Sequence, residues 1–417
     1  MEYQVVTTKA GFTRKNPGTF RRQLAGRGVN IYGGYAADIW GNTTGGIRQG
    51  SVYNGLLKFG VNLDFQKLMD IPGLKFQTSW YWLSGKDASA DLVGNIFTIS
   101  DNAGFATLRV FELWAEQSLL NDKISIRVGQ MEADTEFATS TFAYLFLNGT
   151  FGWPAYIYAN IPNGGPGLPM SAIGVRITAN PTVCTTVRSG VFQGNVFPQY
   201  VNRHGFDYNL DPSNGYLWLN EAEFRSSPFG LPATYKAGAW FDTANFAKPG
   251  NPAHEYPWNY GLYLIADQKL WTPTSDSVPL VSDGKSQPDK QIDPKGSPAN
   301  NKGLGWFGRC AFSPQDRSFM EFYFDTGLAY TGLIPTRDND QIGLAVAYGN
   351  LSPPQANVFL SRGSSNAGYE LLLESTYSAI VNKWLSIQPD LQYVIHPGAT
   401  GALGNALVVG CRASITF

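Results

Sequence analysis

Charged residues are scarce in this 417-residue chain. Asp, Glu, Lys and Arg make up 15 % of it, against about 25 % in ordinary soluble domains. The net charge of −1 gives no overall field that favours nucleic acid as a partner. Apolar residues never run for the roughly 18 positions that a membrane-crossing helix needs, so that class is excluded. A membrane β-barrel is not excluded, because alternating strands average out in hydropathy.

Cysteine and histidine are equally rare. Cys184, Cys310 and Cys411 lie far apart, each in a strand-like segment. Their spacing matches neither a disulfide framework nor a zinc site, so we interpret them as small apolar side chains. The three histidines lack metal-ligand spacing as well, and no cofactor or metal is expected. The first residues do not have the basic start and apolar core of a signal peptide. If the chain is an exported barrel, that signal has been removed.

Glycine and aromatic residues are abundant, with 46 glycines and 14 % Phe, Trp and Tyr. Segments of alternating apolar and polar residues follow one another from end to end, separated by turns rich in Gly, Pro and Asn. Most have about the 9–11 residues that cross a bilayer when tilted. The predicted strands, about sixteen in number, are 29–38, 51–64, 73–82, 107–117, 123–131, 171–178, 183–192, 216–224, 233–242, 258–269, 303–312, 318–328, 340–349, 369–379, 384–395 and 405–417.

The last of these segments, 405–417, alternates clearly. Its odd-numbered positions from Leu407 to Phe417 are apolar and share one face, whereas Arg412 lies on the other. A free aromatic C-terminus on such a strand is typical of bacterial outer-membrane barrels, whose strands alternate in this way. The last strand of a soluble sandwich would alternate too, but its apolar face would need a second layer. We therefore expect this strand to pair with the first, near 29–38, with Arg412 in the lumen and Phe417 towards lipid.

The connections alternate in length, as they do between the two rims of an outer-membrane barrel. Segment 39–50 is among the long ones. Segment 270–302 is long where a short turn is due, and 313–317 is short where a long loop is due. Either the strand count is off by one here, or the barrel carries a periplasmic excursion. The predicted fold is all-β: a single transmembrane antiparallel barrel over 29–417, after an N-terminal periplasmic lead-in, 1–28.

The connection 132–170 is long enough to fold into such a barrel and constrict it. It is rich in aromatic residues, among them Phe137, Tyr144 and Trp153, and has Pro and Gly over 162–169. An exposed cap packed on itself is the alternative, and we favour the constriction loop.

Three motifs stand out in the second half of the chain: Gly303-Leu-Gly-Trp-Phe-Gly-Arg309, Tyr323-Phe-Asp-Thr-Gly-Leu-Ala-Tyr-Thr-Gly-Leu333 and Gln388-Pro-Asp-Leu-Gln-Tyr-Val-Ile-His-Pro-Gly398. In sequence and order they resemble motifs of the carbohydrate-selective porin family (OprB type). The resemblance implies a sixteen-stranded barrel of a Gram-negative-type outer membrane that passes sugars, often with a preference for glucose. Its partners would be neutral sugars and the lipid bilayer, not nucleic acid; monomer and homotrimer both stay open.

Polar residues on neighbouring strands could line this pore. Glu112, Trp114 and Glu116 share a face, and by its phase Arg127 points to the same side of the next strand. An acidic pair beside an arginine can bind vicinal hydroxyls; a structural ion-pair ladder is the alternative. Mixed signs with almost no net charge fit a neutral solute. Further candidates for the inner wall are Arg176, Arg188, Lys236, Trp240, Asp267, Arg309, Glu321 and Glu374.

The sequence thus predicts a passive, sugar-preferring diffusion channel rather than an enzyme. A general or differently selective porin on the same fold is one alternative, and a soluble all-β carbohydrate-active enzyme is another. Carboxylate pairs such as Glu221 and Glu223 could suggest a glycosidase. However, residues two apart on a strand share a face without any catalytic reason. The chain has no phosphate-binding loop and no nucleophile elbow.

Overall fold

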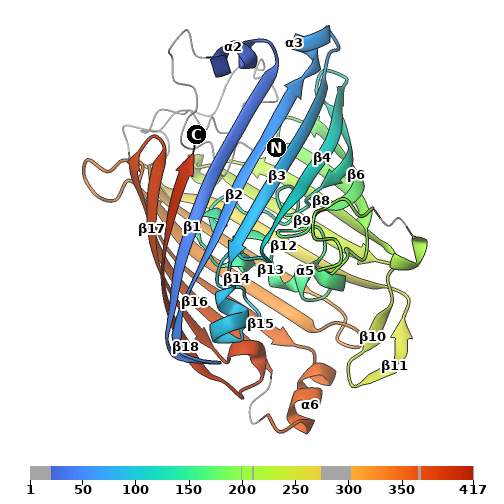
Figure 1. The fold of residues 1–417 in the computed structure, drawn as a ribbon, viewed down its shortest axis with the longest axis vertical. Helices are drawn as coiled ribbons and strands as arrows, with labels where there is room; N and C mark the ends of the chain where they lie inside the picture. Colours follow the sequence, from blue (N-terminus) through green and yellow to red (C-terminus); the bar gives the residue numbers. More distant parts are fainter. Residues whose placement is uncertain (1–19, 199, 209–210, 274–301, 365–367, 417) are drawn as a thin grey trace.

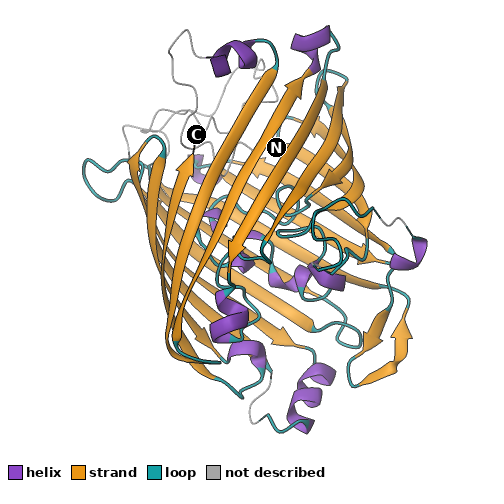
Figure 2. Ribbon diagram, in the orientation of Figure 1, coloured by secondary structure: helices purple, strands orange, loops and turns teal. Residues whose placement is uncertain are grey.

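The chain forms a closed barrel of antiparallel strands (Figures 1 and 2). The structure, a computed structural model, describes residues 20–198, 200–208, 211–273, 302–364 and 368–416. Sixteen strands make up the barrel. They are β1 (Val29–Gly46), β2 (Gly50–Asp64), β3 (Leu74–Gly85), β4 (Thr107–Leu119), β5 (Ile124–Met131), β6 (Ala172–Thr182), β7 (Thr185–Gln193), β8 (Tyr216–Ser226), β9 (Ala233–Asp242), β12 (Asn259–Trp271), β13 (Gly303–Phe312), β14 (Met320–Thr331), β15 (Gln341–Leu351), β16 (Tyr369–Asn382), β17 (Leu385–Ile395) and β18 (Gly404–Thr416).

Every predicted strand is present, and the predicted fold class is confirmed. One boundary was wrong: β1 continues to Gly46, so 39–50 is not a long loop but mostly strand. The polar and glycine residues of 41–46 hid this extension, although their backbone still pairs with β18 and β2.

Smaller elements lie outside the barrel wall. A two-stranded hairpin, β10 (Phe246–Lys248) with β11 (Asn251–Tyr256), was not predicted, nor was α6 (Pro353–Ser361). The helices α2 (Phe20–Gly26) and α3 (Phe65–Met69) lie at the opposite end of the barrel (Figure 1). In the described part of the chain, no helix has the length and apolar character to cross a membrane.

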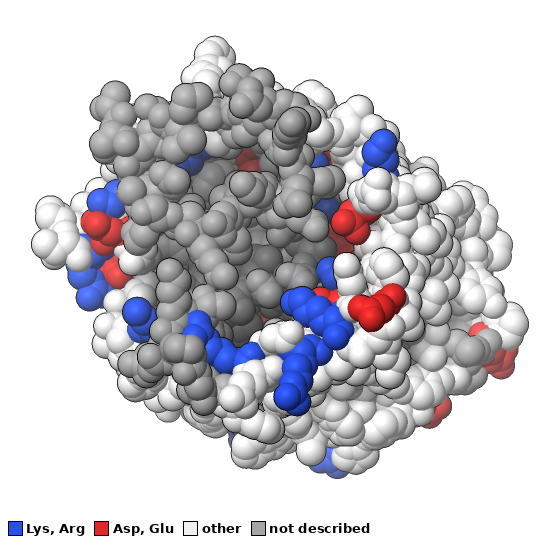
Figure 3. Space-filling view, turned by 90° about the horizontal axis from the view of Figure 1, so that it is seen from above, with Lys and Arg blue, Asp and Glu red and all other residues white. Residues whose placement is uncertain are grey.

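The two faces of the wall differ as the alternation predicts. In β18, Ala406 and Val408 point inwards and are fully buried. Val409, the residue after Val408, points outwards and is 48 % exposed. Large apolar side chains such as Leu264 and Leu344 are exposed on the outside of other strands. Seen from the end of the barrel that carries α2, charged residues lie around the barrel opening, and most of the other described surface in this view is uncharged (Figure 3). Such an outer face suits hydrocarbon, whereas the inner face carries buried polar residues such as Glu374 and Arg412 together with apolar ones.

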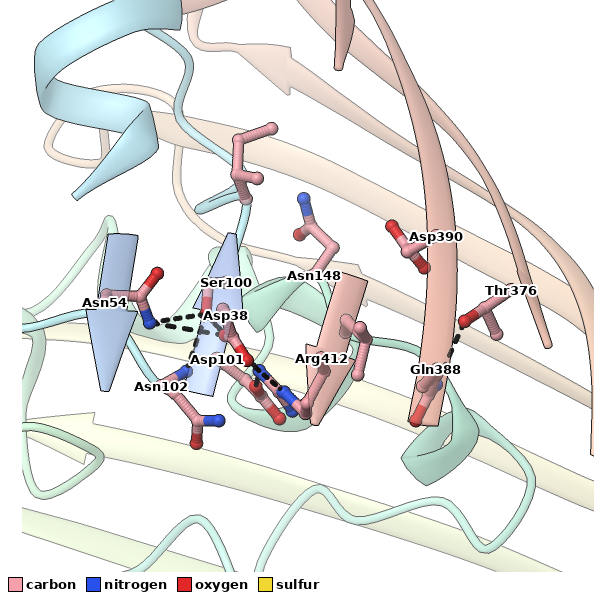
Figure 4. A network of polar contacts seen from close by, with 12 residues as sticks. Asp38, Asn54, Ser100, Asp101, Asn102, Asn148, Thr376, Gln388, Asp390 and Arg412 are labelled. Atoms are coloured by element: carbon pink, nitrogen blue, oxygen red, sulfur yellow. Dashed lines mark hydrogen bonds and ion pairs between the residues drawn. The ribbon is translucent and has the colours of Figure 1, made fainter. Parts of the chain in front are cut away.

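The barrel closes where β18 meets β1, as predicted. Asp38 and Arg412 are direct partners in the register, and Arg412 Nε lies 2.7 Å from Asp38 Oδ1 (Figure 4). Ser100 donates to Asp38 at 2.6 Å, and Arg412 also pairs with Asp101. Beside them, the ring of Trp40 covers Gly410, where any Cβ would clash with it. The predicted lipid-facing position of Phe417 lies outside the described residues.

The connection between β12 and β13 lies on the rim where β1 begins and β18 ends. Its described residues stop at 273 and resume at 302. The strand count is therefore right, and the 270–302 connection begins and ends at that rim; residues 274–301 lie outside the described part. Of the predicted lead-in 1–28, only the part from residue 20 is described, and it contains α2. The connections 86–106, 132–171, 194–215, 243–258 and 352–368 belong to the other, long-loop rim.

The hydrophobic core lies inside the barrel rather than between two sheets. It is built by two connections that turn inwards, 86–106 and 132–171, here called the first and second inward loops. Phe97 of the first and Tyr156 of the second both pack against Tyr323 of β14. Phe146 and Phe151 pack against Phe307 of β13 in the same way. The described residues of 132–170 are thus not an exposed cap.

Inner-wall carboxylates hold both loops by their backbone. Glu370 accepts hydrogen bonds from the N–H groups of Ile96 and Phe97 in the first loop. In the second loop, Glu374 accepts from Leu147 N at 2.6 Å. Asp267 accepts from Thr141 N at 3.1 Å and also from the hydroxyl of Ser140 at 2.6 Å. A buried carboxylate needs such donors, and loop N–H groups that have left water need acceptors. Each group therefore satisfies the other.

Removal of the seam cation should destabilise the barrel. Arg412→Met leaves Asp38 buried without its partner, so we expect the free energy of unfolding in detergent to fall by roughly 3–5 kcal/mol. Lys67→Met serves as the control, because its pair with Asp64 is exposed and 3.5 Å long and should contribute about 1 kcal/mol or less. Urea titration followed by heat-modifiable gel mobility measures both. Equal effects of the two changes would contradict the role of the seam pair.

The carboxylate anchors predict a local effect on the second inward loop. In the double variant Asp267→Ala, Glu374→Ala, amide hydrogen exchange over residues 140–148 should speed up by at least roughly tenfold, since the segment loses several hydrogen bonds that contribute about 0.5–1.5 kcal/mol each. Glu223→Ala removes a wall carboxylate whose ion pairs are all with wall residues. This control variant should leave hydrogen exchange over 140–148 unchanged. If exchange is unchanged in the double variant as well, Asp267 and Glu374 do not hold the second inward loop.

Candidate functional site

Four paired charges form the centre of the site. Arg127 of β5 contacts Glu116 of β4 and Glu136 of the second inward loop, each at 2.6 Å. Arg176 of β6 contacts the same two carboxylates, at 2.8 and 2.5 Å. We call these four residues the charge box. Its formal charge is zero, and each cation has two anionic partners.

The register of the wall explains why the box forms. Glu116 is the direct partner of Arg127, which is in turn the direct partner of Arg176. Two guanidinium groups side by side on adjacent strands repel each other unless carboxylates lie between them. The wall supplies Glu116, and the second inward loop supplies Glu136. Docking of that loop therefore completes the box.

An aromatic ring borders the box. The guanidinium carbon of Arg127 lies 3.8 Å from the ring centre of Trp114, a cation–π contact. The indole N–H of Trp114 donates to Glu112 at 3.0 Å, and Glu112 also accepts from Gln77 and Ser79. The predicted group of Glu112, Trp114, Glu116 and Arg127 is thus brought together on one face.

A second group of paired charges continues along the wall. Arg188 of β7 lies 3.3 Å from Glu221 and 3.0 Å from Glu223 of β8. Lys236 of β9 approaches the same carboxylates at 3.8 and 3.7 Å. Lys236 also donates to Thr139 of the second inward loop at 2.7 Å. Arg225 of β8 also pairs with Glu223, at 2.7 Å. Three cations thus meet two anions, and the inner wall presents interleaved charges rather than a field of one sign.

Other predicted wall residues hold the structure together instead. Asp267 and Glu374 bind the second inward loop, as described above. Arg309 pairs with Asp325 and donates to the carbonyls of Ala138 and Thr150 in that loop. Trp240 is buried in the core, where its ring lies against Gly261.

The predicted position of Glu321 on the inner wall is wrong. Met320 pairs with Leu351 and Phe322 with Asn350, so Glu321 is the extra residue of a β-bulge. Its carboxylate accepts from Asn350, which lies on the outward-facing side next to Tyr348. Strict alternation from Tyr323 and Asp325 had placed it inside. A bulge shifts that phase by one residue.

The aromatic residues of the second inward loop serve mainly as packing. Phe137 is fully buried against Phe192. Trp153 is 7 % exposed and donates to the carbonyl of Gly164. Tyr144 is half-buried and remains the predicted loop aromatic with the larger accessible surface.

Sequence reasoning missed four polar residues of the interior. Lys58 of β2 lies over the ring of Tyr81 and is half-buried. Alternation along 51–64 could have found it, since Asn54 and Leu56 share its face. Asp101, Asp134 and Glu136 come from the inward loops, where no periodicity indicates direction. Among the described residues, no group of three or more His, Cys, Asp and Glu is arranged to hold a metal ion.

This chain is similar to several proteins named as porins or channels. Porin B of Pseudomonas aeruginosa is 22 % identical to this chain, over 95 % of this chain and 89 % of that protein. The high-pH structure of Pseudomonas putida OprB superposes with a TM-score of 0.80 at 22 % identity, covering 95 % of this chain and 96 % of the other. The outer membrane channel DcaP of Acinetobacter baumannii shares the fold more distantly, with a TM-score of 0.53, 12 % identity and coverage of 93 % and 97 %.

The sequence profile of the carbohydrate-selective porin, OprB family matches residues 48–417, nearly the whole barrel. The resemblance seen in the motifs is therefore confirmed, and the setting is the bacterial outer membrane. The chain belongs to the carbohydrate-selective porin, OprB family, and it is an outer-membrane sugar porin.

Proposed function

We propose that this porin passes neutral, glucose-like sugars by passive diffusion and that the charge box is where they bind. The observation that carries the proposal is the local neutrality of the box: Arg127 and Arg176 are each matched by Glu116 and Glu136. The paired charges bring strong donors and acceptors together without a net field, and Glu116 is the most exposed of the four side chains, at 14 % against 2–6 % for the others. Such a surface can replace the hydration of hydroxyl groups while it gives ions no preference.

The four side chains of the charge box would bind different atoms of the sugar. The guanidinium groups donate to sugar hydroxyl oxygens, and the carboxylates accept from hydroxyl hydrogens, so that a vicinal diol is bound at both of its oxygens. Trp114 offers an edge for the apolar side of the ring. Because every group already has a partner in the empty pore, a sugar exchanges hydrogen bonds rather than adding them. Binding therefore stays weak enough for release.

The second inward loop is proposed to set the width of the pore at this point. It contributes Glu136 to the box, and Glu374 and Asp267 hold it against the opposite part of the wall. A loop fixed at both sides narrows the lumen without blocking it permanently. The width of the pore and the hydrogen bonds to the sugar would then select the solute at the same point along the lumen.

Arg127→Ala should weaken sugar binding while the barrel still folds. We expect the glucose concentration that half-blocks the single-channel current to rise roughly tenfold, the factor for the loss of one charged hydrogen bond of about 1.4 kcal/mol. Arg225→Ala is the matched control, because Arg225 also pairs with a wall carboxylate but is 43 % exposed near a turn. Its block should equal that of the unchanged protein.

Two outcomes would count against the proposal. Unchanged block in Arg127→Ala would remove this residue from the sugar site. If no hexose or oligosaccharide blocks the unchanged protein at any concentration, the pore does not bind sugars at the box. Heat-modifiable gel mobility of each variant confirms that the barrel has formed.

A further inference from the structure

A cleft of about 720 Å³ opens on the long-loop rim, between the β10–β11 hairpin and α6 (Figure 1). The turn between β13 and β14 also lines it, through Arg317 and Phe319. Residues 159–162, within the second inward loop, also line the cleft. The cleft therefore borders the loop that we propose sets the pore width. None of the residues of the charge box lines it.

The charged residues that line this cleft are all basic: Lys248, Arg317 and Arg362. Arg317 is compensated, because it donates to both oxygens of Asp316 at 3.0 and 2.9 Å. These hydrogen bonds lower the pKa of the Asp316 carboxyl, which stays ionised. Lys248 and Arg362 form no ion pair with any described residue. Two uncompensated positive charges thus belong to the cleft.

The apolar part of the lining suits a carbohydrate ring. Arg317 is held from outside the cleft by the rings of Tyr256 and Trp258, whose centres lie 4.1 and 4.2 Å from its guanidinium carbon. Phe246 and Phe319 add apolar surface. The volume falls in the range of small-molecule sites and exceeds what one inorganic anion needs. Size, apolar surface and positive charge together indicate a saccharide that carries a carboxylate.

We propose that this cleft is an outer docking site for acidic carbohydrates, with Lys248 and Arg362 binding the carboxylates of uronic-acid units. It extends the proposed function, since the charge box has no unpaired cation to prefer an acidic sugar. A ligand held in the cleft is next to the second inward loop and close to the pore entrance. Weak binding there raises the local concentration of acidic sugars at the mouth.

The test is block of single-channel current by digalacturonate, compared with maltose, in full-length protein in planar bilayers. In the double variant Lys248→Gln, Arg362→Gln, we expect digalacturonate to bind roughly fivefold more weakly when added on the long-loop side. Maltose block should not change. Digalacturonate added on the other side should block both proteins equally.

The matched control removes two cations elsewhere on the same rim, in Arg48→Gln, Lys86→Gln. Both side chains are exposed, and neither lines the cleft. An equal loss of digalacturonate block in this control would show a general field effect and overturn the site, as would unchanged block in the cleft variant. Absence of block by both glucose and maltose in every protein would instead refute sugar binding at the charge box, so the two failures are distinguishable.

A second measurement identifies the occupant. Digalacturonate should slow amide hydrogen exchange over residues 353–362 in the unchanged protein and not in the cleft variant. Lipopolysaccharide also carries anionic groups and is the competing ligand. If lipopolysaccharide vesicles protect this segment and digalacturonate does not, the carbohydrate assignment is wrong.

Discussion

A sheet in lipid can leave no edge unpaired, and this constraint governs the whole molecule. Here the requirement is met where β18 pairs with β1, and the ion pair of Arg412 with Asp38 lies at that junction. Closure separates an outer face that meets hydrocarbon from an inner face that never does. Polar residues can then occupy every second position of each strand. The even number of strands also returns both chain ends to one rim.

Closure creates a second requirement, because a polar wall must find partners. Two inward loops supply them, and in return the wall's carboxylates accept the hydrogen bonds of loop N–H groups. Glu370, Glu374 and Asp267 all act in this way. The same loops bring the aromatic residues that form the core inside the barrel. Stability and pore shape therefore depend on the same contacts, and a change at an anchor should affect both.

Charge is distributed differently along the path of a solute. In the charge box and along β7–β9, cations and anions are matched within 4 Å. At the outer cleft, Lys248 and Arg362 are unmatched among the described residues. A basic entrance would bind acidic sugars and raise their concentration at the pore opening. Inside the lumen, paired charges would select sugars by hydrogen bonds to their hydroxyl groups. These are independent properties, since they lie on different residues.

The sequence by itself determined the barrel. Alternation at period two is a local property, so it located sixteen strands, the seam strand, and the shared face of Glu116 and Arg127. Tertiary structure alone decided which inward residues meet the solute and which bind a loop, because Asp267 and Arg309 look like any other wall charge until residues more than 100 positions away dock on them. It also decided the direction of Glu321, since a bulge is a matter of pairing between strands. Glu136 gained its place in the charge box in the same way, from a loop whose course no periodic pattern records.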